Sequence, residues 1–188
     1  SNLEALQSFC SITESIIHDK KVCLGDVVGY NADPNPVVEW IRDNIDLALA
    51  GNHDYCVLNK TDASYLNPAA YQASAWTQKN LKESNKIFLN TLPIEKEEDG
   101  IYWVHSSPFE PKKWHYVSTK KNAEKNFDYF DQTICFLGHS HLPGIFEKNK
   151  NNKIYSHGVT KQDLDPESRY IINVGSLGQP RDGNPNPV

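Results

Sequence analysis

Aspartate, asparagine and histidine side chains recur after short turns in this sequence, in an order that suits metal binding. Two groups carry oxygen ligands, Gly25-Asp26 and Gly51-Asn52-His53-Asp54. Two more carry imidazoles, His105-Ser106-Ser107-Pro108 and Gly138-His139-Ser140-His141. A carboxylate such as that of Asp26 has two oxygens and can bridge two cations. This set of oxygen and nitrogen donors suits Mn, Zn, Fe or Co better than Mg or Ca.

Any one of these groups is weak evidence, because a Gly-Asp or Gly-His pair most often marks an ordinary turn. Their order is stronger evidence, since each group directly follows a stretch that is expected to be a strand. His18, His115 and His157 lie outside the pattern and are expected to be ordinary surface or hairpin residues.

The elements that must position these groups alternate between strands and helices. Apolar runs predict strands, the first of them fully buried, over residues 21–25, 47–50, 100–104, 133–137 and 170–174. Residues 145–155 predict a hairpin. This alternation predicts an α/β fold with a largely parallel sheet. The carboxyl ends of parallel strands meet at one sheet edge, so the side chains that follow them are expected to converge.

Helices are expected between the strands. Apolar residues at spacings of three and four predict one from Leu3 to Ile16, with Ser1 and Glu4 as its capping box. Others are expected over residues 37–44, from Asn67-Pro68 to about Lys82, and from a cap at Ser84 to a stop before Pro93. Residues 112–131 are polar and predict a surface loop and helix.

Composition excludes several classes of protein. The 188 residues suit one domain spanning 1–188. The net charge is −5 without basic blocks, which argues against a nucleic-acid partner. The chain has no run of about 18 apolar residues, so no membrane span is expected. Its four widely spaced cysteines fit neither a zinc pair nor a disulfide framework, and Cys23 and Cys135 predict small core residues. Reduced cysteines favour a cytoplasmic location, although the absence of Met leaves a removed signal peptide open.

The four groups together resemble the successive motifs of the calcineurin-like metallophosphoesterase superfamily, the first reading Gly25-Asp26-Val27-Val28-Gly29. The resemblance covers nearly the whole chain. Residues 173–183 are similar to a further motif of the small bacterial and archaeal branch, which includes single-domain phosphodiesterases. The resemblance implies a four-layer αββα sandwich with a two-metal site. The loop from Gly175-Ser176 to Gly183 follows the last strand and is expected beside that site.

The resemblance also implies a role for each ligand. Asp26 bridges the two metals, and His141 binds the first of them. Asn52, His105 and His139 bind the second. The metals are two divalent transition-metal ions, with Mn expected first and Zn, Fe, Co or Ni as alternatives.

By the same resemblance, His53 contacts the substrate phosphate and protonates the leaving oxygen. Asp54 is expected to orient His53 through a carboxylate–imidazole hydrogen bond and to favour its acid form. Residues that could line the substrate pocket are Tyr30, Asn31, Trp76 and Arg181.

The sequence departs from the family pattern in two places. The family opens with a strand that carries Asp-x-His, so we expect such a strand upstream of Ser1 in the natural polypeptide. Residues 184–188 likewise stop where the family continues into more sheet. Gly29-Tyr30-Asn31 stands where protein Ser/Thr phosphatases have Asp-Arg-Gly, which argues against that branch.

The expected activity is hydrolysis of a small phosphate ester. Two metals lower the pKa of a bridging water, and the resulting hydroxide attacks phosphorus in line with the leaving group. Three alternatives stay open: a non-catalytic scaffold of the same fold, a nuclease, and a diadenosine-polyphosphate hydrolase or phosphomonoesterase with the same site. The sequence leaves the substrate and the oligomeric state undetermined.

Overall fold

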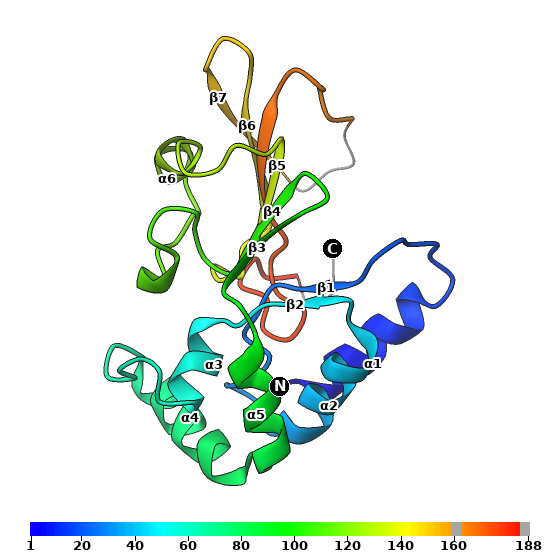
Figure 1. Cartoon of the computed structure of the whole chain (residues 1–188), viewed down its shortest axis with the longest axis vertical. Coiled ribbons are helices and arrows are strands. Elements are labelled where there is room, and N and C mark those ends of the chain that lie inside the picture. Colours follow the sequence, from blue (N-terminus) through cyan, green and yellow to red (C-terminus); the bar gives the residue numbers. More distant parts are fainter. Residues whose placement is uncertain (159–162, 185–188) are drawn as a thin grey trace. The chain divides into compact units, whose positions relative to one another are not determined.

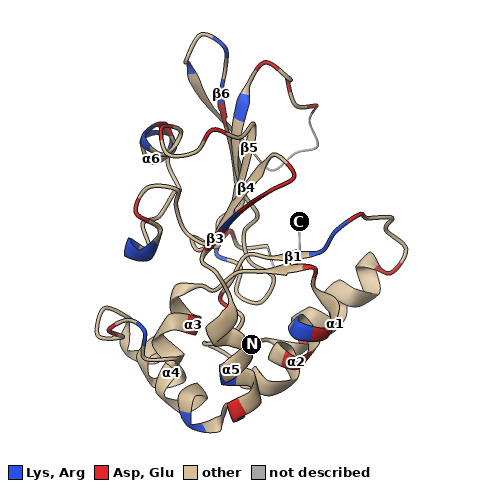
Figure 2. Ribbon diagram, in the orientation of Figure 1, with Lys and Arg blue, Asp and Glu red and all other residues tan. Residues whose placement is uncertain are grey.

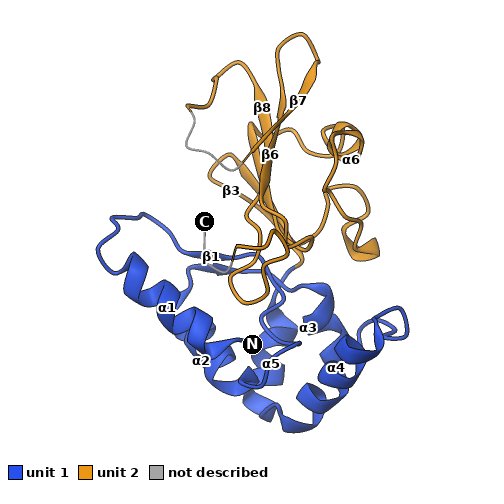
Figure 3. Cartoon of the chain, turned by 180° about the vertical axis from the view of Figure 1, so that it is seen from behind, with its two compact units in different colours: residues 1–93 blue, residues 94–188 orange. Residues whose placement is uncertain are grey.

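The computed structural model describes residues 1–158 and 163–184. The chain forms two compact units, Ser1–Pro93 and Ile94–Val188, which Figure 3 shows in different colours. The expectation of a single domain over residues 1–188 stays a prediction. Residues 185–188, which include most of the segment expected to stop short of the family's sheet, lie outside the described part.

The first unit combines a short parallel sheet with helices (Figure 1). Strand β1 pairs with β2, and Val22 lies opposite Leu47. The elements are α1 (Leu3–Thr13), β1 (Val22–Cys23), α2 (Pro34–Asn44), β2 (Leu47–Ala48), α3 (Asn52–Val57), α4 (Pro68–Asn80) and α5 (Glu83–Thr91). The sequence analysis did not predict α3. The residues of β1 are half-buried, which corrects the expectation of a fully buried strand, and Cys23 is half-buried with them.

Polar side chains join the helices of the first unit. The Asn35 amide donates to the carbonyl of Asn80 at 2.9 Å. Its oxygen accepts from the backbone N–H of Lys82 at 2.8 Å and from the Asn85 side chain at 3.0 Å. One side chain of α2 therefore holds the end of α4 and the start of α5 in place.

Helix caps follow the sequence in part. Asn67 caps α4 as predicted, accepting from the N–H of Ala70 at 2.9 Å. The cap of α1 is Asn2, whose side chain accepts from the N–H of Ala5 at 3.0 Å, and not the expected Ser1. Helix α5 begins after Lys82, so Ser84 lies inside its first turn and is not its cap.

The second unit is built on a six-stranded sheet in the order β3-β4-β5-β8-β6-β7. Its elements are β3 (Glu95–Glu98), β4 (Ile101–Val104), the 3₁₀ turn η1 (Pro111–Lys113), α6 (Lys120–Asn126), β5 (Ile134–Leu137), β6 (Gly144–Lys148), β7 (Ile154–His157) and β8 (Arg169–Asn173). Strands β4, β5 and β8 are parallel, whereas β3, β6 and β7 join antiparallel. The sheet is therefore mixed, which corrects the expectation of a largely parallel sheet. The predicted α/β class is confirmed.

The antiparallel strands arise from tight turns. Asp99 and Gly100 both have positive φ, 55° and 75°, as a two-residue hairpin turn requires. This Asp-Gly pair joins β3 to β4, and it is the sequence signal for the strand β3 that the sequence analysis missed. The hairpin of β6 and β7 is confirmed.

The core of the second unit lies on one face of its sheet. Tyr102, Cys135 and Ile171 occupy neighbouring positions on β4, β5 and β8 and are buried. Helix α6 packs on β6 and β7. Residues 112–131 were expected to form a polar surface, but Val117, Ala123, Phe127 and Phe130 in that stretch are buried in this core.

Two broad features complete the fold. All four cysteines are free, as the sequence predicts, and Cys135 is fully buried. None of the helices in residues 1–158 and 163–184 has the length and apolar character that a lipid bilayer requires of a spanning segment.

Phe127 provides a test of this core. We expect Phe127→Ala to lower the free energy of unfolding by about 3–5 kcal/mol, because a buried aromatic side chain leaves a cavity. Chemical denaturation followed by tryptophan fluorescence measures the loss. Leu164→Ala, at an exposed site, is the control and should change stability by less than about 0.5 kcal/mol. Equal losses for the two variants would contradict the proposed core.

Candidate metal centre

The backbone turns sharply where β1 ends, and Asp26 occupies this turn. Its φ is 53°, in the left-handed region that residues other than Gly, Asn and Asp rarely adopt. The Asp26 Oδ1 accepts a hydrogen bond from the backbone N–H of His53 at 2.9 Å. A Cβ on Gly51 would lie 2.1 Å from the same oxygen, so only glycine fits there. The Asp26 side chain of the first motif is therefore in close contact with the backbone of the second motif.

Asp54 joins the same two loops from within. Its carboxylate is fully buried and accepts from the backbone N–H groups of Val27 at 3.3 Å, Val28 at 3.0 Å and Gly51 at 2.7 Å. Both oxygens are therefore engaged by the loops that follow β1 and β2. This loop-joining role was not expected from the sequence, and the expected hydrogen bond from the His53 imidazole to the Asp54 carboxylate stays a prediction.

His53 lies in a closely fitted place beside these loops. Its side chain is buried, and the ring of Tyr30 lies against it with the centroids 4.2 Å apart. Gly29 has φ of 98°, and a Cβ there would lie 2.8 Å from the His53 Nδ1. Tyr30 itself has φ of 59°. The strained turn at Gly29 and Tyr30 thus fixes the space around the imidazole.

Asn52 begins α3 and is also buried. Its Nδ2 donates to the hydroxyl of Tyr65 at 3.2 Å, and that hydroxyl lies 3.6 Å from the Sγ of Cys56. Burial raises the pKa of both the Tyr65 phenol and the Cys56 thiol. The contact of Tyr65 with the candidate ligand Asn52 was not predicted from the sequence, because no local motif marks it.

In the second unit, buried histidines follow β4 and β5. His105 comes directly after β4, and His139 and His141 follow β5 with φ of 61° each. Ring nitrogens of His105 and His139 lie within 4.8 Å of one another. The left-handed backbone at both histidines after β5 is a strained conformation of the kind that clusters at functional sites.

Backbone carbonyls orient two of these imidazoles. The Nε2 of His139 lies 2.9 Å from the carbonyl oxygen of Trp114, and the Nδ1 of His141 lies 2.8 Å from that of Gln179. A carbonyl can only accept, so each of these nitrogens carries the proton. In the neutral imidazole the other nitrogen, Nδ1 of His139 or Nε2 of His141, presents a lone pair. Metal-binding histidines are held in this way.

Aromatic residues of the loop after β4 pack around the histidines. The Tyr116 ring stacks on His139 with the centroids 4.4 Å apart and an angle of 15° between the planes. Trp114 meets His105 edge-on at 5.9 Å. Nothing in the sequence pattern of residues 108–118 predicted these contacts, because they depend on the loop's path.

The loop that follows β8 lies beside His141, as predicted. Asn173 donates to the carbonyl of Gly138 at 2.9 Å and to the Ser140 hydroxyl at 2.8 Å. The backbone N–H of Arg181 donates to the carbonyl of His141 at 3.1 Å. The Arg181 guanidinium donates to the side chain of Gln179 at 3.2 Å.

The remaining residues considered from the sequence lie elsewhere on their units. Asn31 is exposed in the loop before α2, and Trp76 lies on the exposed side of α4. His18 and His115 are exposed, and His157 pairs with Glu147 across the hairpin at 2.8 Å, so all three are ordinary histidines as expected.

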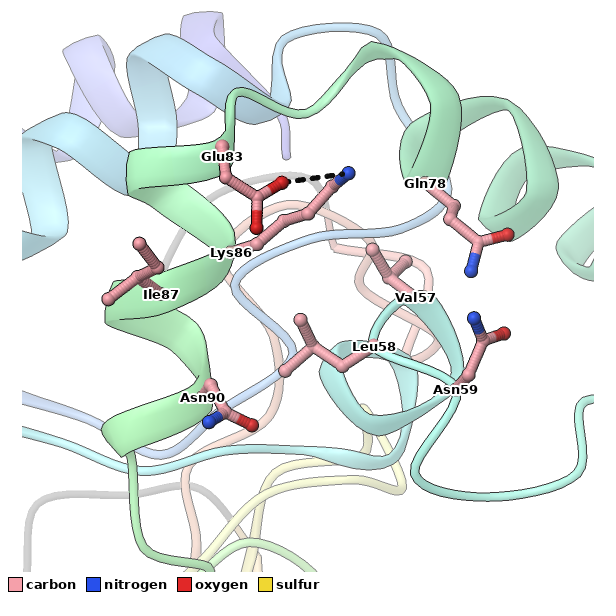
Figure 4. Close-up of a pocket in the computed structure, with 8 residues that line it drawn as sticks. All are labelled: Val57, Leu58, Asn59, Gln78, Glu83, Lys86, Ile87 and Asn90. Atoms are coloured by element: carbon pink, nitrogen blue, oxygen red, sulfur yellow. Dashed lines mark ion pairs between the residues drawn. The ribbon is translucent and has the colours of Figure 1, made fainter.

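A surface pocket of the first unit is separate from the ligand-bearing loops. Figure 4 shows its lining residues on α4, on α5 and at the end of α3, with Lys86 paired to Glu83 at 3.5 Å. None of the predicted ligands lines it.

The donor chemistry fits divalent transition metals. The donors are carboxylate and amide oxygens and imidazole nitrogens, without a thiolate. The asparagine and the histidines are buried. The tautomers of His139 and His141 leave one unprotonated nitrogen on each ring.

Comparison with known proteins identifies the family of the chain. The sequence model of the calcineurin-like phosphoesterase superfamily domain matches residues 1–188. An uncharacterized protein of Methanocaldococcus jannaschii is 40% identical over 187 residues, which is 97% of this chain and 74% of that protein.

Solved structures agree as well. The crystal structure of a metallophosphoesterase from Sphaerobacter thermophilus has a TM-score of 0.82 and 34% identity, covering 99% of this chain and 77% of that one. A hypothetical protein from Pyrococcus horikoshii shares the fold at a TM-score of 0.66 and 16% identity, covering 93% and 70%. The predicted fold, the α/β fold of calcineurin-like metallophosphoesterases, is thereby confirmed. The chain belongs to the calcineurin-like phosphoesterase superfamily.

Proposed function

We propose that this protein is a dinuclear metal-dependent hydrolase of small phosphate esters. The observation that carries the proposal is the hydrogen bonding of His139 and His141 to backbone carbonyls, which leaves one ring nitrogen of each free of a proton. Membership of a phosphoesterase superfamily supports the same reaction. The metals would be held by Asp26, Asn52, His105, His139 and His141.

Each donor has a distinct part in this proposal. The Asp26 carboxylate would be shared by both ions, since it alone in the set offers two equivalent oxygens. His141 would hold the first ion, and Asn52, His105 and His139 would hold the second. When bound, the ions supply Lewis-acid chemistry that polarises phosphoryl oxygens and activates water.

His53 is the proposed general acid. Its imidazole is buried beside the Asp26 loop. The hydrogen bond from the His53 backbone N–H to the Asp26 carboxylate and the contact with the Tyr30 ring fix its position. A protonated imidazole there stabilises negative charge on the phosphate and gives its proton to the leaving oxygen. Tyr30 and Arg181 are proposed substrate contacts, together with Asn31.

Small esters are favoured over nucleic acids as substrates. The net charge is −5. Figure 2 shows lysine and arginine residues spread among acidic ones on both units, without a continuous basic stripe over the described residues. A nuclease needs such a stripe to bind the phosphate backbone. Buried, oriented imidazoles also argue against a scaffold without activity, which has no need of them.

Activity and metal content test the proposal together. We expect the purified full-length protein to carry or take up two transition-metal ions per chain and, with Mn²⁺ added, to hydrolyse a chromogenic phosphodiester or monoester. Elemental analysis and absorbance assays provide the readouts. A chain that binds no transition metal and hydrolyses neither ester would exclude the proposed function.

A second prediction separates the roles of two residues. We expect His53→Ala to lower kcat by about 10²–10⁴-fold while the metal content stays nearly intact, because general acids contribute on that scale. Asp26→Asn should instead lose metal, since one charge serves both ions. If His53→Ala strips the metals, or leaves turnover unchanged, the division of roles is wrong.

The third prediction concerns Asp54. Its three backbone partners are buried, so Asp54→Ala leaves their N–H groups without acceptors. We expect a loss of roughly 3 kcal/mol in the free energy of unfolding. Asp54→Asn keeps one acceptor oxygen and should lose less. If Asp54 served only to orient His53, both variants would lower kcat without changing the denaturation midpoint.

A further inference from the structure

A metal-binding asparagine must have its amide held in one orientation. The two ends of the amide look alike in size, but only the oxygen can bind a cation, and the NH₂ group would point its hydrogens at it. Asn52 is buried at the start of α3. Its Nδ2 donates to the Tyr65 hydroxyl at 3.2 Å, and this bond distinguishes the two ends of the amide.

The loop that carries Tyr65 is itself held by local hydrogen bonds. Asp62 accepts from the backbone N–H and the hydroxyl of Ser64, at 2.9 and 2.6 Å. The N–H of Leu66 donates to the carbonyl of Ala63 at 3.1 Å. The first of these turns ends directly before Tyr65 and the second spans it, so the backbone that carries this side chain is held in place.

The third member of this chain of contacts is Cys56. Because the Tyr65 oxygen accepts from Asn52, its O–H can donate to the Cys56 Sγ, 3.6 Å away. In the order Asn52 to Tyr65 to Cys56, one Asn52 amide hydrogen and the Tyr65 hydroxyl hydrogen each have an acceptor, and the Asn52 Oδ1 faces away from Tyr65.

We propose that Tyr65 is a positioning residue that fixes the amide of Asn52 so that its oxygen is presented to the metal. The inference rests on the proposed function, in which Asn52 is a metal ligand. Tyr65 acts through Asn52 and needs no contact with the substrate.

Tyr65→Phe removes the hydroxyl and keeps the ring. We expect it to weaken Mn²⁺ binding by about 10–100-fold, as loss of a hydrogen-bond partner of a ligand usually does. Calorimetric titration of the full-length protein with Mn²⁺ measures this without any substrate. Tyr71→Phe is the matched control, because Tyr65 and Tyr71 are both 52% exposed. The control should bind Mn²⁺ like the wild type, and both variants should keep the wild-type circular dichroism spectrum.

The Asn52→Asp background tests the mechanism. A carboxylate has two equivalent oxygens and needs no choice between ends, so adding Tyr65→Phe there should change Mn²⁺ affinity by less than about threefold. An equal loss in both backgrounds would show that Tyr65 acts in another way. The same holds if the single variant binds Mn²⁺ like the wild type.

Asn52→Ala separates this inference from the function on which it rests. If Asn52→Ala weakens Mn²⁺ binding but Tyr65→Phe does not, the positioning role is wrong and the ligand assignment stands. If neither variant changes Mn²⁺ affinity, the assignment of Asn52 as a ligand fails, and the positioning role fails with it.

Discussion

Left-handed backbone after the strands is the constraint on which the candidate ligand loops of each unit depend. Asp26, His139 and His141 all have φ between 53° and 61°. Such residues cost about 1–3 kcal/mol each unless the surroundings hold them. The turn changes the direction of the chain directly after the strand, so the side chain at the turn no longer follows the alternation of the strand. The backbone of a residue placed in this way is strained, so other interactions must offset the cost of the strain.

Buried polar side chains provide that compensation in each unit. Asp54 accepts three backbone N–H groups from the loops after β1 and β2. Asn173 binds both Gly138 and Ser140 in the second unit. In both cases a side chain from another element replaces the backbone partners that the turning loop has lost, as buried N–H and C=O groups require. The fold and the ligand positions therefore share the same hydrogen bonds.

The sequence predicts what is repeated and local. Motif order predicted the candidate ligands, alternating patterns identified most strands, and the Asn67-Pro68 pair marked the start of α4. The hairpin at Asp99-Gly100 was also local and could have been found. The contacts of Tyr116 with His139 and of Tyr65 with Asn52 could not, because they join loop residues whose paths depend on tertiary packing. The role of Asp54 was hidden for the same reason. Its carboxylate accepts from backbone N–H groups, which nearly every residue possesses, so the residue types of its partners give no signal.

The orientation of the donor atoms carries the most chemistry and the least sequence information. Two imidazoles are set by the carbonyls of Trp114 and Gln179, groups that every residue possesses. A substitution at either position keeps the carbonyl, provided that the loop keeps its path. The ligand geometry is therefore insulated from changes in the side chains around it.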